Sequence, residues 1–206
     1  MSQDKIYFDP ANKQIHLTDN SSHLIWREEG VTPPPPPPSF DDWFLPSQDE
    51  LAAMRTNLYA ESVGNFLDGE YWSSSEYNGI FAWKHRFSTD AQFRTETKAG
   101  SLSAVRACRS FTAGVAEYAL RDTGPAGGLI FYVDGTTYYE AAPYDQSTGY
   151  DSWWCDLDLG ATLLGASGTA IGTGATNTST MVNYPGYGTG DHEVAAKYCV
   201  DLVITP

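Results

Sequence analysis

The stretch DWFLPSQDEL, residues Asp42–Leu51, carries the strongest local structural signals in the chain. Pro46 fixes φ just before a helix start. The spacing of Ser47 and Glu50 predicts a capping box, in which each side chain bonds the backbone N–H of the other residue. We therefore predict a helix over residues 48–59. Three apolar residues lead into it, and we expect all three to be buried: Trp43, Phe44 and Leu45.

Short strands are predicted downstream of this helix. Aromatic and β-branched runs favour strands over residues 70–74, 81–87 and 102–109. Within the middle run, strict alternation places Trp83, His85 and Phe87 on one face and Lys84 and Arg86 on the other.

The second half of the chain begins with an apolar run over residues 127–135 that ends in an Asp-Gly turn. Together with residues 137–141 it predicts a β-hairpin. Residues 145–188 are rich in Gly, Thr, Ser, Asn and Tyr, which indicates a long structured loop. A final helix is predicted through Leu202, with Asp191 as its N-cap.

Composition excludes several partner classes. The 206 residues carry a formal net charge of −14, so nucleic acid, anionic membrane and sulfated polyanions are poor partners, because each phosphate or sulfate contact needs Lys or Arg. The N-terminus, MSQDKIYFDP, has no apolar signal core, and no apolar run is long enough for a membrane span. We expect cytoplasmic synthesis, no membrane insertion, and an extracellular site of action.

Chemistry-bearing motifs are sparse. Cys108, Cys155 and Cys199 are too few for a disulfide framework, and three reduced, mostly buried thiols are the favoured interpretation. No nucleophile elbow occurs, and we expect no enzymatic activity and no cofactor. Two acidic runs are candidates for a calcium site: Asp156 with Asp158, and Asp191 with His192 and Glu193. We favour solvated acidic loops over a metal site for both.

Residues 1–31 form a predicted β extension with three short strands, which is marginally stable alone. We expect it to anchor the chain, to oligomerise, or to contact other virion proteins. Residues 32–39 contain six consecutive prolines, which predict a stiff polyproline II spacer. Docking of a proline-binding module is the alternative to a plain spacer. Residues 40–206 would then form the main domain.

Eight motifs lie between residues 40 and 203: DWFLPSQDEL (42–51), YWSSSEY (71–77), AW (82–83), VRACR (105–109), DTGPAGGLIFYVDG (122–135), YYEAAPYDQS (138–147), GTAIGTGATNT (168–178) and AAKYCVDLV (195–203). Together they resemble the Lcl C-terminal domain family of bacterial surface and phage proteins. The resemblance implies an α+β, C-type-lectin-like fold with two short helices, short antiparallel strands and long structured loops.

The order of the motifs departs from that family, in which the GPAGGLIFY segment comes first and the domain ends at VRACR. Here the second half precedes the first, so the domain resembles a circularly permuted member. The two halves could close within one chain, or residues 123–206 could complete a neighbouring subunit. In either case residues 40–46 should lie near residues 203–206, and the first helix should pack against the last.

The resemblance, the spacer and the acidic head predict a non-enzymatic virion surface protein, such as a phage fibre, spike or decoration protein. Its head would bind a host-surface glycan or protein, and a homo-oligomer is expected. The alternatives are a purely structural particle component and a bacterial cell-surface adhesin. The predicted ligand-binding residues surround one loop: Tyr77, Asn78, Phe81, Lys84 and Arg86. Residues 144–156 are a second candidate rim. Trp72 and Trp83 are expected in the core.

Overall fold

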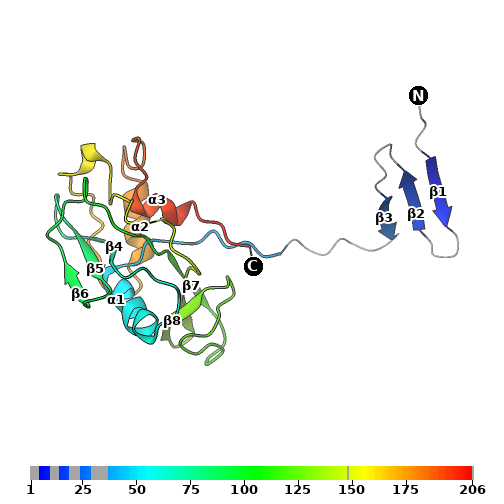
Figure 1. Ribbon diagram of the computed structural model, residues 1–206, viewed down its shortest axis with the longest axis horizontal. Coiled ribbons are helices and arrows are strands. Elements are labelled where there is room, and N and C mark those ends of the chain that lie inside the picture. The colour runs from blue at the N-terminus through cyan, green and yellow to red at the C-terminus, as the bar shows by residue number, and fades with distance from the viewer. Residues whose placement is uncertain (1–4, 10–13, 19–23, 29–36, 148, 206) are drawn as a thin grey trace. The chain divides into compact units, whose positions relative to one another are not determined.

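The fold is α+β, with a few short helices and small antiparallel sheets (Figure 1). The computed structural model describes residues 5–9, 14–18, 24–28, 37–147 and 149–205. The chain separates into two compact units, Met1–Pro37 and Pro38–Pro206. The boundary falls inside the proline run, and we call the second unit the head.

The N-terminal unit contains one antiparallel sheet in the order β1-β2-β3. Its strands are β1 (Lys5–Asp9), β2 (Gln14–Thr18) and β3 (Leu24–Glu28). The three predicted short strands are thereby confirmed. The prolines at 33–36 lie outside the described residues, so the predicted rod is not described.

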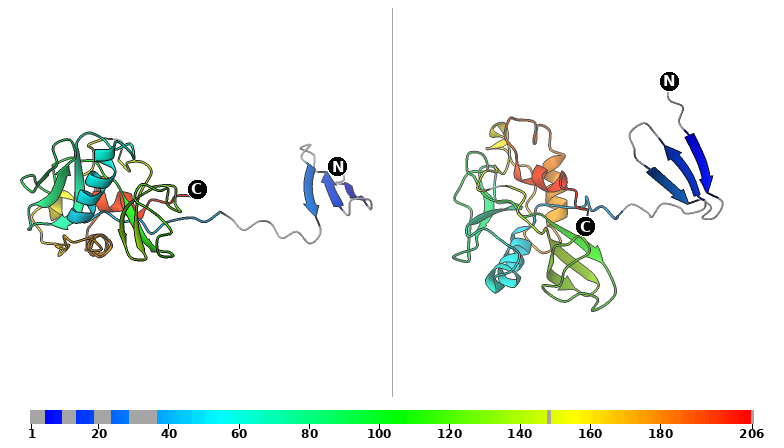
Figure 2. Two further views of the ribbon diagram at one scale, coloured as in Figure 1. Left: turned by 90° about the horizontal axis from the view of Figure 1, so that it is seen from below. Right: turned by 45° about the vertical axis from the view of Figure 1, so that its right-hand side comes forward.

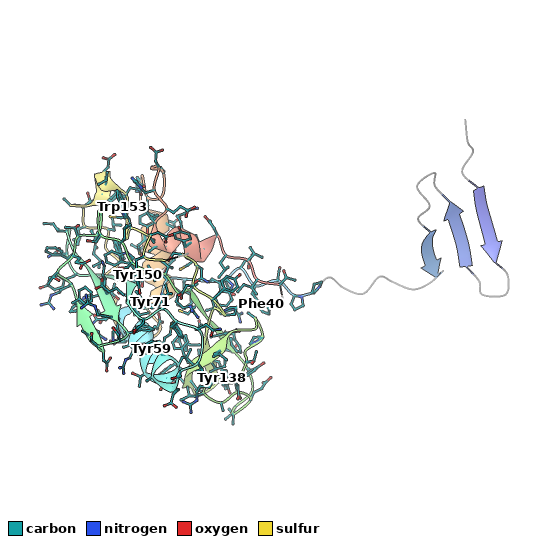
Figure 3. All side chains as sticks on the ribbon, in the orientation of Figure 1. Phe40, Tyr59, Tyr71, Tyr138, Tyr150 and Trp153 are labelled. Atoms are coloured by element: carbon teal, nitrogen blue, oxygen red, sulfur yellow. The ribbon has the colours of Figure 1, made fainter. Side chains whose placement is uncertain are left out.

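The DWFL segment separates two hydrophobic cores of the head. Trp43 and Leu45 lie in one core and Phe44 in the other, and all three are buried, as predicted. This alternation follows from extended backbone, in which successive side chains point to opposite sides. Tyr71 and Trp72 divide between the same two cores. Tyr71, labelled in Figure 3, is fully buried.

Helix α1 (Gln48–Asn57) begins with the predicted capping box. Glu50 accepts a hydrogen bond from the Ser47 N–H at 2.7 Å, and the Ser47 hydroxyl accepts from the Glu50 N–H at 3.3 Å. The helix ends two residues earlier than predicted, and a 3₁₀ turn follows at Tyr59–Glu61. Its main contacts are with strands β4, β5 and β8 rather than with the last helix, so the prediction that it packs against the last helix is wrong.

The first sheet of the head joins β4 (Glu70–Glu76), β5 (Ala82–Arg86) and β6 (Ala91–Phe93) in that order. Strands β4 and β5 were predicted and β6 was not. Two serines of β4 donate to backbone: Ser73 Oγ to the Trp83 carbonyl and Ser75 Oγ to the Gly168 carbonyl. In Figure 1, β5 and β6 lie at the far left of the head.

The second sheet has the order β7-β9-β8, from β7 (Cys108–Thr112), β8 (Leu129–Asp134) and β9 (Thr137–Ala141). The predicted hairpin of β8 and β9 is confirmed. The predicted strand over residues 102–109 is wrong for most of its length, because residues 103 and 104 make only isolated bridges. The two halves of the domain meet here within one chain, as Cys108 pairs with Ala141.

Helices α2 (Gly174–Val182) and α3 (Ala195–Val200) complete the head, with a 3₁₀ turn at Leu157–Leu159. Two short helices were predicted and the head has three, because α2 falls in the segment expected to be loop. Helix α3 starts four residues after the predicted N-cap, and its N-cap is Val194 rather than Asp191. Helices α2 and α3 pack against each other.

The chain ends of the head lie side by side, as predicted. Phe40 and Ile204 exchange backbone hydrogen bonds of 2.9 and 3.0 Å. Figures 1 and 2 show the red C-terminal segment running beside the pale-blue segment that enters the head. Both end segments of the head are thus held by backbone hydrogen bonds where they meet.

Candidate binding surfaces

The predicted binding loop follows β4 and turns back into β5. Tyr77 is 48% exposed, whereas Phe81 is half-buried. Asn78 is occupied in shaping the turn, since its side-chain oxygen accepts from the N–H groups of Ile80 and Phe81 at 2.8 and 2.9 Å. Of these three predicted site residues, Tyr77 therefore offers the most contact area to a ligand.

Lys84 is a correction to the predicted site. Its side chain is 1% exposed, and its ammonium group lies 4.1 Å from the centre of the Trp72 ring. It donates to Glu96 at 2.6 Å and lies 3.7 Å from Glu70. Burial lowers the pKa of Lys84. Lys84 and His85 lie on opposite faces of β5 and are both buried, so period-2 alternation does not distinguish a surface face here.

Arg86 is exposed, but Glu70 already holds it. Its Nε donates to the Glu70 carboxylate at 3.0 Å, and a second bond from the same guanidinium reaches the same oxygen. The Glu70 carboxylate raises the pKa of Arg86. An external anion would have to compete with Glu70, which makes Arg86 a weak binding residue.

Arg94, which the sequence reasoning missed, lies at the predicted loop instead. It follows β6, and its guanidinium carbon lies 4.3 Å from the centre of the Tyr77 ring and 4.8 Å from that of Trp83. Trp83 was expected in the core but is only half-buried. The turn signal at residues 88–90, just before Phe93, indicates a third strand, and Arg94 follows that strand beside the predicted loop.

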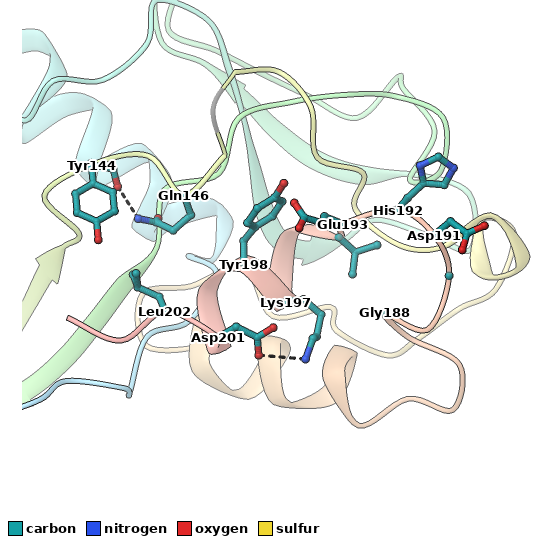
Figure 4. A pocket seen from close by; sticks show the side chains of 12 residues that line it. Tyr144, Gln146, Gly188, Asp191, His192, Glu193, Lys197, Tyr198, Asp201 and Leu202 are labelled. Carbon is teal, nitrogen blue, oxygen red and sulfur yellow. Dashed lines mark hydrogen bonds and ion pairs between the residues drawn. The ribbon is translucent and has the colours of Figure 1, made fainter.

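A groove runs along helix α3, with a volume of about 420 Å³. Its rim includes the start of the second predicted rim, residues 144–156. We call it the α3 groove, and these residues line it: Tyr144, Gln146, Gly188, Gly190, Asp191, His192, Glu193, Val194, Lys197, Tyr198, Asp201 and Leu202. Figure 4 shows Tyr144 and Gln146 at one end, with Asp191 and His192 at the other.

Two side chains of the α3 groove, Tyr198 and His192, are held by neighbouring residues. Burial and a hydrogen bond to Glu193 raise the pKa of Tyr198, so its phenol stays neutral. Trp153 stacks on His192 with ring centres 3.8 Å apart, and Figure 3 labels Trp153 near the top of the head. The Trp153 carbonyl accepts from the Ala195 N–H at 2.8 Å, which fixes the loop to the start of α3.

A second hollow of about 450 Å³ adjoins the groove and shares Gly190, Asp191 and His192 with it. Asp156 lies in its wall, where its carboxylate accepts from the N–H groups of Gly188 and Gly190 at 2.6 and 2.9 Å. These bonds occupy the carboxylate that was a calcium candidate. Among the described residues, no group of three or more His, Cys, Asp or Glu could hold a metal ion.

The cysteines are free and buried, which confirms the interpretation as reduced interior thiols. Burial raises the pKa of the Cys155 thiol to about 12, and it raises the pKa of Cys108 and Cys199 well above the usual value. Because a thiolate is the reactive form, these thiols are poor nucleophiles and poor metal ligands.

Comparison with known proteins gives no relative. No family model matches the chain, and neither a curated protein nor a solved structure matches it. The resemblance to the Lcl C-terminal domain family therefore stays a prediction. Within the described ranges, no helix combines the length and the apolar character needed to cross a membrane. What the fold and the sites define is an α+β head with a groove along α3 and an aromatic loop surface.

Proposed function

We propose that this chain is a non-enzymatic virion surface protein, such as a phage fibre, spike or decoration protein, whose head binds a host-surface glycan. The α3 groove carries the proposal. Its volume of about 420 Å³ falls within the range of small-ligand sites, about 300–1,000 Å³. Its lining combines phenol rings with carboxylates, and these are the groups that stack on sugar rings and accept bonds from hydroxyls.

The charge of the groove favours a neutral sugar. Asp191, Glu193 and Asp201 line it, while Lys197 is engaged with Asp201 at 3.1 Å. An anionic ligand would meet like charge there, which costs affinity. Tyr144 is exposed at the end of the groove and supplies rigid contact area with few rotatable bonds.

Cell binding tests the function, and one substitution tests the site. The labelled full chain should bind at least one candidate host, and a neutral glycan from that host should compete. Tyr144→Ala should reduce binding about tenfold, as truncation of an aromatic residue that contacts the ligand does. Val115→Ala is the control, because Val115 is 78% exposed and does not line the groove. Absence of binding to every candidate host would refute the function, and full binding by Tyr144→Ala would refute the site.

A structural role in the particle is the second candidate, and exposed aliphatic side chains favour it. Leu157 and Leu163 are each 64% exposed on the head, and such residues mark protein interfaces when they form a patch. In that case the particle would carry many copies with these side chains buried between subunits. Hydroxyl-radical footprinting of intact particles should then protect Leu157 and Leu163 relative to the free protein.

A further inference from the structure

Arg94 differs from every other basic residue in the described head. None of its N–H groups bonds another described residue, and no carboxylate of these residues lies within 4.0 Å of it. Within the described part of the chain, its partners are the rings of Tyr77 and Trp83. The other eight Lys and Arg side chains each lie within 4.0 Å of a carboxylate: Arg55, Lys84, Arg86, Lys98, Arg106, Arg109, Arg121 and Lys197.

This isolation is notable in a chain with a formal net charge of −14. Carboxylates outnumber cations, yet no carboxylate of the described residues pairs with Arg94, while two aromatic rings fix the guanidinium by cation–π stacking. A stacked guanidinium keeps its N–H groups at the edge of its plane, where they match both oxygens of a carboxylate. Arg94 is exposed, so this edge is open to a ligand.

Two exposed aliphatic side chains lie on and beside the loop that carries Tyr77. Ile80 and Leu163 are 46% and 64% exposed. The two loops that carry them are in contact. A Cβ atom built on Gly79 would lie only 3.7 Å from the Leu163 nitrogen. We define the Arg94 surface as Tyr77, Ile80, Trp83, Arg94 and Leu163. It lies at the β5–β6 side of the head, and none of its residues lines the α3 groove.

We propose that the Arg94 surface is a second binding site, which takes a sugar acid carrying a single carboxylate. The carboxylate would pair with the guanidinium, and the C–H face of the sugar ring would lie on Tyr77. A polyanion fits poorly, because one unpaired cation on a strongly acidic protein can compensate one charge only. The site takes an anion where the α3 groove favours a neutral ligand, so it goes beyond the proposed function.

Titration of the labelled full chain, followed by NMR chemical shifts, tests this proposal with two matched probes. Methyl glucuronoside should shift the amide signals of residues 77–83 and 94, and methyl glucoside should bind at least tenfold more weakly. Arg94→Gln should weaken glucuronoside binding about tenfold or more, the range for a hydrogen bond to a charged group. Arg121→Gln removes the same charge from an exposed position outside the Arg94 surface and should leave binding unchanged.

Three further arms make the outcome decisive. Arg94→Lys keeps the charge but loses the planar fork, so it should also bind more weakly, and it replaces Arg94→Gln if that variant is unstable. Tyr144→Ala should leave glucuronoside binding intact, which separates this site from the α3 groove. The proposal is refuted if both glycosides bind equally, if Arg94→Gln and Arg121→Gln act alike, or if an acetylated aspartyl tripeptide binds more tightly than the sugar acid.

Discussion

Lys98→Met should destabilise the head strongly, because it breaks an ion pair with no exposure to solvent. Lys98 Nζ donates to Glu76 at 2.6 Å and to the Thr162 carbonyl at 2.6 Å, and both side chains of the pair are fully buried. The ammonium group also lies 5.0 Å from the centre of the Trp154 ring. Methionine fills a similar volume but leaves the Glu76 carboxylate without its cation.

The size of the effect follows from what remains after the substitution. Removing one partner of a buried pair costs about 3–5 kcal/mol. The lower end applies here, because Glu76 still accepts from the N–H groups of Leu164 and Gly165 at 2.8–3.0 Å. We expect a loss of about 3 kcal/mol, or roughly 6–12 °C in melting temperature for a protein of this size.

Urea denaturation followed by tryptophan fluorescence measures the loss, since five of the six tryptophans lie in the head. Lys197→Met is the matched control. It removes an exposed pair of 3.1 Å to Asp201 and should cost less than about 0.5 kcal/mol. The double variant Glu76→Gln, Lys98→Met should lose about 1–3 kcal/mol less than the sum of the single variants. A loss below 1 kcal/mol in Lys98→Met would refute the reasoning.

Three further predictions follow from buried groups. Gly128→Ala should cost more than about 3 kcal/mol, because its Cβ would lie 1.9 Å from the Ala141 carbonyl oxygen, while Gly149→Ala meets open space and should change the unfolding free energy by less than about 0.5 kcal/mol. Burial lowers the pKa of His85 below 6.5, so its stabilising contribution is complete above pH 6.5 and is lost as the pH falls toward the folded-state pKa. His85→Phe should therefore lose less stability than the wild type between pH 7.5 and 5.5 in urea titrations. Finally, the three buried thiols should resist a disulfide reagent at pH 8 in the native protein and react at once in denaturant.

Local sequence signals predicted the elements that local interactions hold. The capping box of Ser47 and Glu50 needs residues three apart, and the β8–β9 hairpin needs an Asp-Gly turn, so both could be found from sequence. Helix α2 was missed because GATNTSTMV has few strong helix formers. Distant partners hold it instead: Thr178 Oγ1 accepts from the Leu45 N–H at 3.0 Å.

The same distinction between local and distant interactions applies to the candidate sites. Tyr77 was placed correctly at the surface, because it follows a strand and precedes an Asn-Gly turn. Lys84 was misplaced because lysine is rarely buried, and no short-range pattern reveals the distant Trp72 ring beneath it. Arg94 was missed because it stands out only by having no carboxylate partner among the described residues. Such pairing cannot be read from sequence.

Ion pairs explain why so acidic a chain has so little free positive charge. Arg106 binds Asp145 at 2.6 Å and also donates to the carbonyls of Gly64 and Ala142, so one buried cation joins three loops. Arg109 on β7 pairs with Glu140 on β9 and with Asp42 in the segment that enters the head. Arg106 and Arg109 are buried in these pairs, so their positive charge does not lie at the surface. Among the Lys and Arg side chains of the described head, Arg94 is the one without a carboxylate partner, and this is why the second binding site is proposed there.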